Sequence, residues 1–216
     1  MNTEFARQQM VEQQVRAWDV FDDNVLSILS EMPREDYVPA GYEDVAYADA
    51  EIPLGFGETM MTPTHEGRLL QALAIGENDS ILEIGTGSGY LTACMAILGN
   101  TVSSIDIHEE LLAAAKTRLD AADLSNVTLQ QMDATAELPE GQFDVIAVTG
   151  SIETFDTRFV EALAPGGRLF VVVGESPAME ARLLTKVSDS DWQSECLFET
   201  DLKPLVNGSL PPQFAF

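Results

Sequence analysis

A glycine-rich segment near the middle of the chain has the composition of a ligand-binding turn. It reads Leu82-Glu83-Ile84-Gly85-Thr86-Gly87-Ser88-Gly89-Tyr90 and follows a short apolar run. Glycines permit a tight turn and a close approach of backbone to ligand, and open α/β sheets bind ligands at the carboxyl end of a first strand. We therefore expect this turn to hold a small molecule through Glu83, Ile84, Gly85, Thr86, Gly87, Ser88, Gly89 and Tyr90.

The spacing of the glycines argues against two common phosphate sites. A dinucleotide site has the pattern GxGxxG with a pyrophosphate on the helix N-terminus, and a P-loop carries a lysine. This turn reads GxGxG, has no lysine and is preceded by Glu83. A carboxylate here would repel a pyrophosphate but would satisfy the ammonium group of a methionine moiety.

Two further acidic residues end the next two predicted strands. We expect Asp106, beside Ile107, to bind both hydroxyls of a ribose, as the acid of dinucleotide folds does. We expect Asp133, followed by Ala134, to accept a hydrogen bond from the exocyclic amine of an adenine. The alternative is that each acid is a helix cap or a turn residue. With the glycine turn, the set resembles class I S-adenosylmethionine-dependent methyltransferases, which implies S-adenosyl-L-methionine as the cofactor.

Alternating strands and helices must position these residues. We predict strands at 80–84, 101–106, 127–132, 143–149 and 168–173. We predict helices between them at 90–98, 109–122 and 154–163. This alternation indicates an α/β fold with a doubly wound, mostly parallel, Rossmann-like sheet. Two more strands follow without an intervening helix and predict a C-terminal antiparallel pair, at 182–188 and 192–203.

The N-terminal part differs from this pattern. Its good helix formers and apolar spacing predict helices at 3–16, 22–31 and 64–74. Between the last two lies a loop rich in proline and glycine, and long ordered loops are often functional. We expect a single domain over 1–216, with an N-terminal helical and acceptor-loop segment at 1–63 and a cofactor-binding core at 64–216.

Short sequence motifs that lie in order over most of the chain carry a more specific resemblance. They lie at 32–39 (MPREDYVP), 46–47 (AY), 52–59 (IPLGFGET), 82–90, 143–149 (FDVIAVT), 163–169 (LAPGGRL) and 203–206 (KPLV). In this order they resemble the protein-L-isoaspartate O-methyltransferase family. The resemblance implies transfer of a methyl group to the abnormal α-carboxylate of an isoaspartyl linkage, with a damaged protein or peptide as partner. It also places Thr149 at the cofactor site.

The acceptor loop departs from that family. The family usually reads Gly-Gln-Thr-Ile-Ser-x-Pro, with the serine hydroxyl near the point of methyl transfer, whereas 57–63 reads GETMMTP. Met61 stands in place of the serine and cannot donate a hydrogen bond. Glu58 would repel an acidic acceptor if it pointed inward. The acceptor-site candidates are therefore Thr59, Met61, Thr62 and His65.

Each of the last two candidates has a specific expected role. Thr62 offers a hydroxyl that would replace the serine after a small shift of the loop. His65 would act as a base or donate to a carboxylate, although a polar residue at a helix start is also ordinary.

Three functions stay open on these residues. The first is a carboxyl methyltransferase of the isoaspartate-repair type. The second is a methyltransferase on the same scaffold with a different acceptor, which the replacement of serine by Met61 motivates. The third is a non-catalytic cofactor-binding protein. We expect the first, and the intact glycine turn argues against the third.

Composition narrows the partners and the location. The net charge is −25, with 36 acidic and 11 basic residues, which disfavours nucleic acid and anionic lipid as partners. No apolar run approaches the roughly 20 residues that span a bilayer, and residues 1–16 lack the apolar stretch of a secretory signal. We expect a cytoplasmic monomer. Cys94 and Cys196 belong to no CxxC or Cys/His cluster, so we expect two buried thiols and no metal site.

Overall fold

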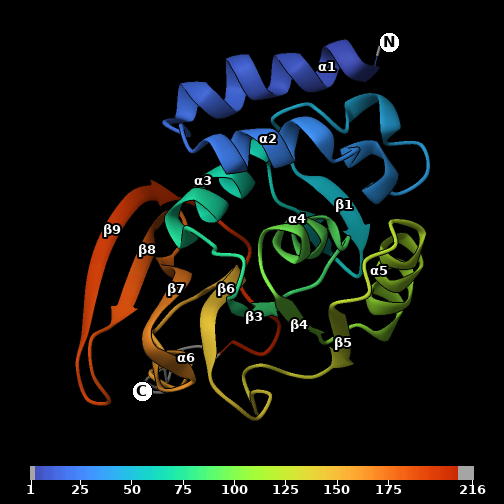
Figure 1. Cartoon of the computed structure of the whole chain (residues 1–216). Coiled ribbons are helices and arrows are strands. Elements are labelled where there is room, and N and C mark those ends of the chain that lie inside the picture. Colours follow the sequence, from blue (N-terminus) through green and yellow to red (C-terminus); the bar gives the residue numbers. More distant parts are fainter. Residues whose placement is uncertain (1–2, 209–216) are drawn as a thin grey trace, which may run out of the picture.

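The computed structural model describes residues 3–208, which build one seven-stranded sheet with helices against it (Figure 1). The strand order is β5-β4-β3-β6-β7-β8-β9. Five neighbouring strands are parallel: β3 (Ser80–Ile84), β4 (Thr101–Asp106), β5 (Val127–Gln131), β6 (Phe143–Ile152) and β7 (Leu163–Glu175). The last two are antiparallel, β8 (Ala178–Lys186) and β9 (Trp192–Thr200). The predicted doubly wound sheet with a C-terminal antiparallel pair is confirmed.

The central strand β6 buries both of its faces. Val145 and Ala147 belong to one apolar cluster, and Ile146 and Val148 belong to another. Successive side chains of a strand point to opposite faces, so a continuous apolar run suits a strand covered on both sides. Strands β4 and β5 lie on one side of β3 and β6 lies on the other. The strand order therefore reverses beside β3, which opens a crevice at the carboxyl ends of the strands.

Helices and a small hairpin surround the sheet. Figure 1 shows α1 (Thr3–Gln9) and α2 (Asp23–Glu31) together at one end of the molecule, next to α3 (Pro63–Leu73). The other helices follow strands of the sheet: α4 (Tyr90–Leu98), α5 (Glu109–Ala121) and α6 (Arg158–Glu161). Strands β1 (Ile52–Gly55) and β2 (Glu58–Met60) form an antiparallel hairpin. The predicted loop-rich region thus contains this hairpin and two 3-10 turns, Arg34–Tyr37 and Glu43–Val45.

Helix starts follow from their caps. The side chain of Asp22 accepts hydrogen bonds from the backbone amides of Asn24 and Val25, which begins α2. Thr62 caps α3, and Pro63 occupies its first turn. The first predicted helix begins as expected in α1, but it continues as a π-helix, Met10–Val15, and a 3-10 turn, Arg16–Trp18.

Two expectations were wrong. The helix predicted at 154–163 is only the single turn α6, because Leu163 already pairs with Phe143 and starts β7. Arg168 is the next residue of β7 that pairs, with Val145. Pro165, Gly166 and Gly167, which lie between Leu163 and Arg168, therefore form a bulge in the strand rather than a helix end. Cys196 is exposed on the edge strand β9, whereas Cys94 is buried as predicted. Within residues 3–208, no helix is long and apolar enough to cross a membrane.

Candidate functional site

A cleft, which we call the main cleft, lies at the carboxyl ends of β3, β4 and β6. It measures about 740 Å³ with its open mouth included. Eight predicted cofactor residues line it: Ile84, Gly85, Gly87, Asp106, Ile107, Asp133, Ala134 and Thr149. A smaller space of about 320 Å³, the side cavity, is lined by Glu83, Thr86 and Ser88. The two spaces share Leu54, Thr59, Gly85, Gly87 and Thr149, so they adjoin at the glycine turn.

The glycine turn has a backbone that only glycine suits. Gly85 and Gly87 have φ of 99° and 51°, in the left-handed region. A Cβ on Gly85 would clash with the hydroxyl of Thr149, which donates hydrogen bonds to the carbonyls of Ile84 and Gly85 at 2.9 Å. The amide of Gly87 donates to Oδ2 of Asp106 at 2.9 Å. Residues of β4 and β6 therefore fix the turn from both sides.

Glu83 is fully buried at the wall of the side cavity. Its Oε2 accepts hydrogen bonds from Ser104 Oγ, at 2.5 Å, and from Thr92 Oγ1. Its Oε1 has no hydrogen-bond partner within the part of the chain that the structure describes. Burial raises the pKa of Glu83 to about 8. A buried carboxylate oxygen without a partner is costly, so this wall of the cavity favours a cationic ligand group.

Asp106 and Asp133 both line the main cleft, with different surroundings. Asp106 accepts from the amides of Gly87 and His108 at 2.9 Å each, and its oxygens keep lone pairs for a ligand. Asp133 accepts from the amide of Thr135 at 2.9 Å, from its hydroxyl at 2.6 Å, and from Nδ2 of Asn207 at 2.9 Å. These hydrogen bonds hold the pKa of Asp133 below its usual range. Asp133 therefore also stabilises a turn, which is the alternative to ligand binding that the sequence left open for this residue.

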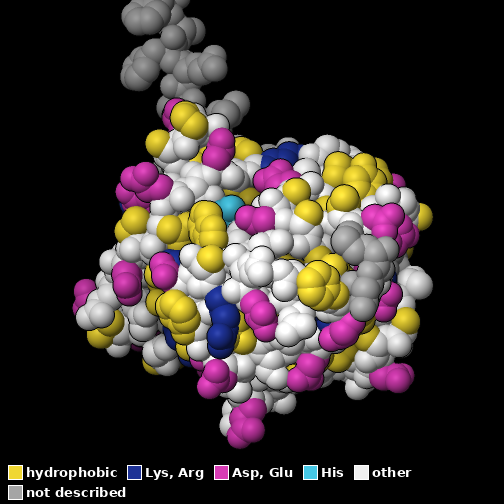
Figure 2. Space-filling model, turned by 90° about the horizontal axis from the view of Figure 1, so that it is seen from above, with side chains coloured by type: hydrophobic (Ala, Val, Ile, Leu, Met, Phe, Trp, Pro, Cys, Tyr) yellow, Lys and Arg dark blue, Asp and Glu magenta, His cyan; other side chains and the backbone are white. Residues whose placement is uncertain are grey.

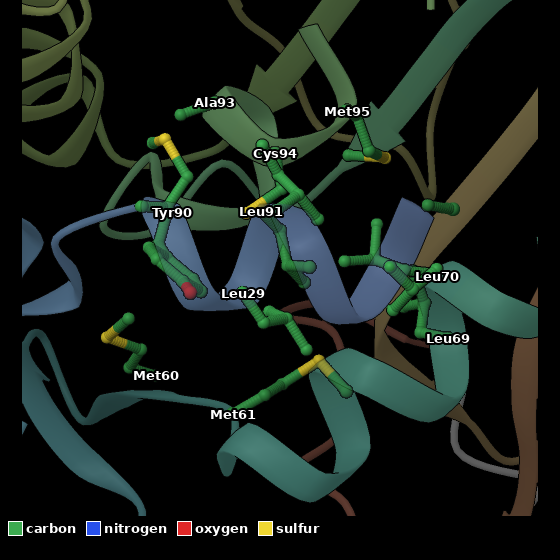
Figure 3. Packing of buried hydrophobic residues seen from close by; sticks show 14 of the residues in the cluster. Leu29, Met60, Met61, Leu69, Leu70, Tyr90, Leu91, Ala93, Cys94 and Met95 are labelled. Carbon is green, nitrogen blue, oxygen red and sulfur yellow. The ribbon is translucent and has the colours of Figure 1, made fainter. Parts of the chain in front are cut away.

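Two residues of the predicted acceptor set line the cavities. Thr59 lines both spaces, and its hydroxyl donates to Glu51 at 3.3 Å. Met61 contacts the side cavity but is only 6% exposed, because its side chain packs in the core. Figure 3 shows it among buried side chains of α2, α3 and α4, including Leu29 and Leu91. Its carbonyl accepts from Nη2 of Arg34 at 2.6 Å.

The other two predicted acceptor residues hold the fold together. The hydroxyl of Thr62 accepts from the amide of His65 at 3.4 Å. The two nitrogens of the His65 ring form hydrogen bonds to the hydroxyls of Thr62, at 2.8 Å, and Thr200, at 2.9 Å. The ring lies 5.8 Å from both Trp18 and Phe198, and burial lowers the pKa of His65. Neither Thr62 nor His65 is among the residues that line the main cleft or the side cavity.

Gly89 and Tyr90, predicted to contact the ligand, also lie outside the two linings. Gly89 is the N-cap of α4, with φ of 84°. The ring of Tyr90 is buried 5.6 Å from the ring of Tyr37 and lies under the guanidinium of Arg34 at 5.4 Å. These two residues therefore support the turn from the core side.

Sequence reasoning missed one whole wall of the main cleft. Leu202, Lys203, Pro204, Leu205 and Val206 all line it, together with Glu58 and His108. The segment 203–206 carries part of the family resemblance, but its apolar pattern does not indicate where the segment lies in the fold. The pairing of Ser151 with Pro204, at the end of β6, brings it to the cleft.

The charge of Glu58 is compensated in the structure. Its Oε1 lies 2.7 Å from Nζ of Lys203 and 3.8 Å from Nε2 of His108. The expected repulsion of an acidic acceptor is therefore offset at this point. This local balance contrasts with the surface in Figure 2, where Asp and Glu side chains are spread over the face and far outnumber Lys and Arg.

Comparisons with known proteins show to which family the chain belongs. The family model described as protein-L-isoaspartate(D-aspartate) O-methyltransferase matches residues 5–209. A protein-L-isoaspartate O-methyltransferase 2 of Pelobacter propionicus is 32% identical over 95% of this chain and 92% of its own length. One of Paracoccus denitrificans is 34% identical over 90% of each chain. A Plasmodium falciparum structure described as a putative protein-L-isoaspartate O-methyltransferase in complex with S-adenosyl-L-homocysteine superposes with a TM-score of 0.78 at 21% identity, over 92% of this chain and 97% of that one. This chain belongs to the protein-L-isoaspartate(D-aspartate) O-methyltransferase family.

Proposed function

We propose that this chain is an S-adenosyl-L-methionine-dependent carboxyl O-methyltransferase that acts on isoaspartyl sites of damaged proteins and peptides. The observation that carries the proposal is the buried Glu83, which lines the side cavity beside a glycine turn and whose Oε1 has no hydrogen-bond partner among the described residues, in a chain of this family. A cationic amino acid moiety would satisfy that oxygen, and a dinucleotide would not.

The residues of the main cleft fit the rest of this cofactor. Glu83 would hold the ammonium group, Asp106 the ribose hydroxyls, and Asp133 with Ala134 the adenine. Ile84, Gly85, Thr86, Gly87, Ser88, Ile107 and Thr149 complete the contact surface. When bound, the cofactor supplies an electrophilic methyl group on a sulfonium.

The acceptor needs positioning more than acid or base help. A carboxylate with an ordinary pKa near 4 is already ionised at neutral pH. The protein must align its oxygen with the methyl group, so most of the rate comes from orientation. Thr59 lines both spaces and carries a hydroxyl that donates hydrogen bonds, so we assign it the role of the family serine. Thr62 caps α3 and His65 packs between aromatic rings, so we assign both a structural role.

A labelling experiment tests the reaction. The purified protein is incubated with methyl-labelled S-adenosyl-L-methionine and an isoaspartyl peptide, with the matching aspartyl peptide as control. We expect base-labile label on the isoaspartyl peptide alone. Absence of that label despite tight binding of S-adenosyl-L-homocysteine would contradict the proposal. Label on small metabolites instead would indicate a different acceptor.

Matched threonine variants test the acceptor residue. T59V removes the hydroxyl that lines the cavities, and T62V removes the neighbouring hydroxyl that caps α3. We expect T59V to lower kcat/KM for the isoaspartyl peptide about 10- to 100-fold, the loss of one hydrogen bond to a charged group. T62V should lower the melting temperature and leave kcat/KM near wild type. The reverse pattern would move the role to Thr62.

We infer one domain over 1–216, a cytoplasmic location, a monomer and no nucleic-acid partner. The charge of −25 supports the last of these, because a polyanion repels a phosphate backbone.

A further inference from the structure

The C-terminal strap, which we define as residues 202–207, lines the main cleft through its residues 202–206. Its middle is fixed to the end of β6 through Ser151. The amide of Ser151 donates to the carbonyl of Lys203 at 2.9 Å, and the amide of Leu205 donates to the carbonyl of Ser151 at 2.9 Å. Ser151 Oγ also donates to the carbonyl of Leu202 at 2.6 Å. A Cβ on Gly150 would lie 2.7 Å from Cδ2 of Leu205, so the glycine admits this close approach.

One end of the strap is pinned to the β1–β2 hairpin. Nζ of Lys203 donates to Oε1 of Glu58 at 2.7 Å and to the carbonyl of Gly57. On its other side, the hairpin contacts the start of α5, because the ring of Phe56 stacks on the ring of His108 at 4.7 Å. The hairpin therefore bridges the strap and the end of β4. Glu58, Lys203 and His108 all line the cleft that is bridged.

The other end of the strap is pinned beside the end of β5. Asn207, with φ of 62°, turns the backbone and donates from Nδ2 to Oδ2 of Asp133 at 2.9 Å. Asp133 is the residue assigned to the adenine and lines the main cleft, so this second pin also lies at the cleft. The strap thus contacts one wall through Lys203 and another through Asn207.

We propose that the strap and the hairpin form a gate over the main cleft, and that Lys203 is a positioning residue that sets the rate at which the cofactor product leaves. The inference rests on the cofactor of the proposed function and is independent of the methyl acceptor. The side chain of Lys203 is 38% exposed and that of Glu58 is 22% exposed. Ion pairs this exposed are weak and are screened by salt, so the pin opens readily and opens faster at high ionic strength.

The experiment measures dissociation of S-adenosyl-L-homocysteine from the full chain. Labelled ligand is chased with unlabelled ligand at NaCl concentrations from low to high. For the wild type, we expect the dissociation rate to rise with salt. For K203M we expect a rate about fivefold higher at low salt, with little dependence on salt. K203R should restore slow, salt-dependent release, because it keeps the charge and the donors.

A matched variant controls for the loss of one positive charge. K116M removes a lysine whose ion pair with Asp120 is exposed on α5, away from the cleft, and should release ligand like the wild type. E58Q should behave like K203M, and E58Q/K203M should add nothing further, because both changes break the same pin. Unfolding of each ligand-free variant, followed by circular dichroism, separates faster release from general destabilisation.

The outcomes distinguish the gate from the cofactor assignment. Equal rates and equal salt dependence in K203M and K116M would overturn the gate while leaving the proposed function intact. Failure of the wild type to bind S-adenosyl-L-homocysteine would overturn the cofactor assignment and the gate together. Acceleration in N207A, about threefold by loss of one hydrogen bond, would add support for the second pin.

Discussion

Arg34 and Glu66 form an ion pair that solvent does not reach. Nε of Arg34 lies 3.0 Å from Oε2 of Glu66, and Nη2 lies 3.1 Å from Oε1. The same guanidinium donates to the carbonyls of Ala46, at 2.5 Å, and Met61, at 2.6 Å. One side chain therefore joins the N-terminal segment, the acceptor loop and α3. Arg34 is fully buried, and such a position requires that all of its donors find partners.

Loss of Arg34 should be strongly destabilising. R34M leaves Glu66 buried without its counter-charge, and burial already raises the pKa of that carboxyl. We expect the free energy of unfolding in urea to fall by about 3–5 kcal/mol. R34M/E66Q should recover part of this loss, because the unpaired carboxylate is gone. Equal losses in the two variants would show that the charge of Glu66 is not the cause.

Asp106 should control cofactor affinity. D106A removes the carboxylate assigned to two ribose hydroxyls, and we expect S-adenosyl-L-homocysteine to bind about 100-fold more weakly. The thermal stabilisation that this ligand gives should then largely disappear. D120A, which removes an exposed carboxylate from the same region of the chain, is the matched control. Unchanged stabilisation of D106A would refute the ribose assignment.

Glu83 should release a proton when the cofactor binds. Burial raises its pKa to about 8, so the free protein at pH 7 holds Glu83 mostly protonated. An ammonium group beside Oε1 favours the carboxylate, so binding should release most of one proton at this pH. Titration calorimetry in buffers of different ionisation enthalpy measures it. E83Q should show no release, and identical binding enthalpies for the wild type in all buffers would contradict the assignment.

The raised pKa of the Glu83 carboxyl also makes the stability of the protein depend on pH. The pKa of Glu83 is higher in the folded state than in the unfolded state, so the folded state keeps its proton longer. Stability of the ligand-free protein should therefore fall as pH rises from about 4.5 to about 8, where the unfolded chain is ionised and the folded chain is not. E83Q should remove this part of the decline in urea unfolding measured across that range.

Met61 should behave as a core residue. M61S restores the serine of the family but removes a packed side chain that is 6% exposed. We expect it to cost about 3 kcal/mol of stability and to lower the melting temperature by about 5–10 °C. M61L should remain within about 1.5 kcal/mol of wild type and keep its activity. A stable and more active M61S would show instead that the hydroxyl belongs at this position.

That the glycine turn and the acidic strand ends lie close together could be predicted from the sequence because its signals are local. Strands 80–84 and 101–106 were predicted with the bounds that the structure has, and their ends carry Glu83 and Asp106. In a parallel sheet, residues at the carboxyl ends of neighbouring strands meet at one edge, so spacing along the chain becomes proximity in space. Gly85 and Gly87 have left-handed backbones, and glycine in the sequence already indicates them.

The acceptor half and the C-terminal wall could not be predicted in the same way. Whether Met61 faces the core or the cleft depends on the register of β1 against β2 and on the packing of α3, which no periodicity encodes. His65 is polar at a helix start, but its partner Thr200 lies 135 positions further along the chain. Lys203 lies 146 positions after Gly57 and 145 after Glu58, beyond the last strand of the sheet, so no local pattern joins them.

That order along the chain has a consequence for synthesis. The C-terminal strap follows all the strands, so it emerges from the ribosome after the glycine turn and the ends of β4 and β5 have been made. A nascent chain that ends before residue 202 lacks this wall of the main cleft. Residence of the cofactor would thus distinguish a chain that has formed the strap from one that has not, and removal of 202–208 should convert slow ligand exchange into fast exchange.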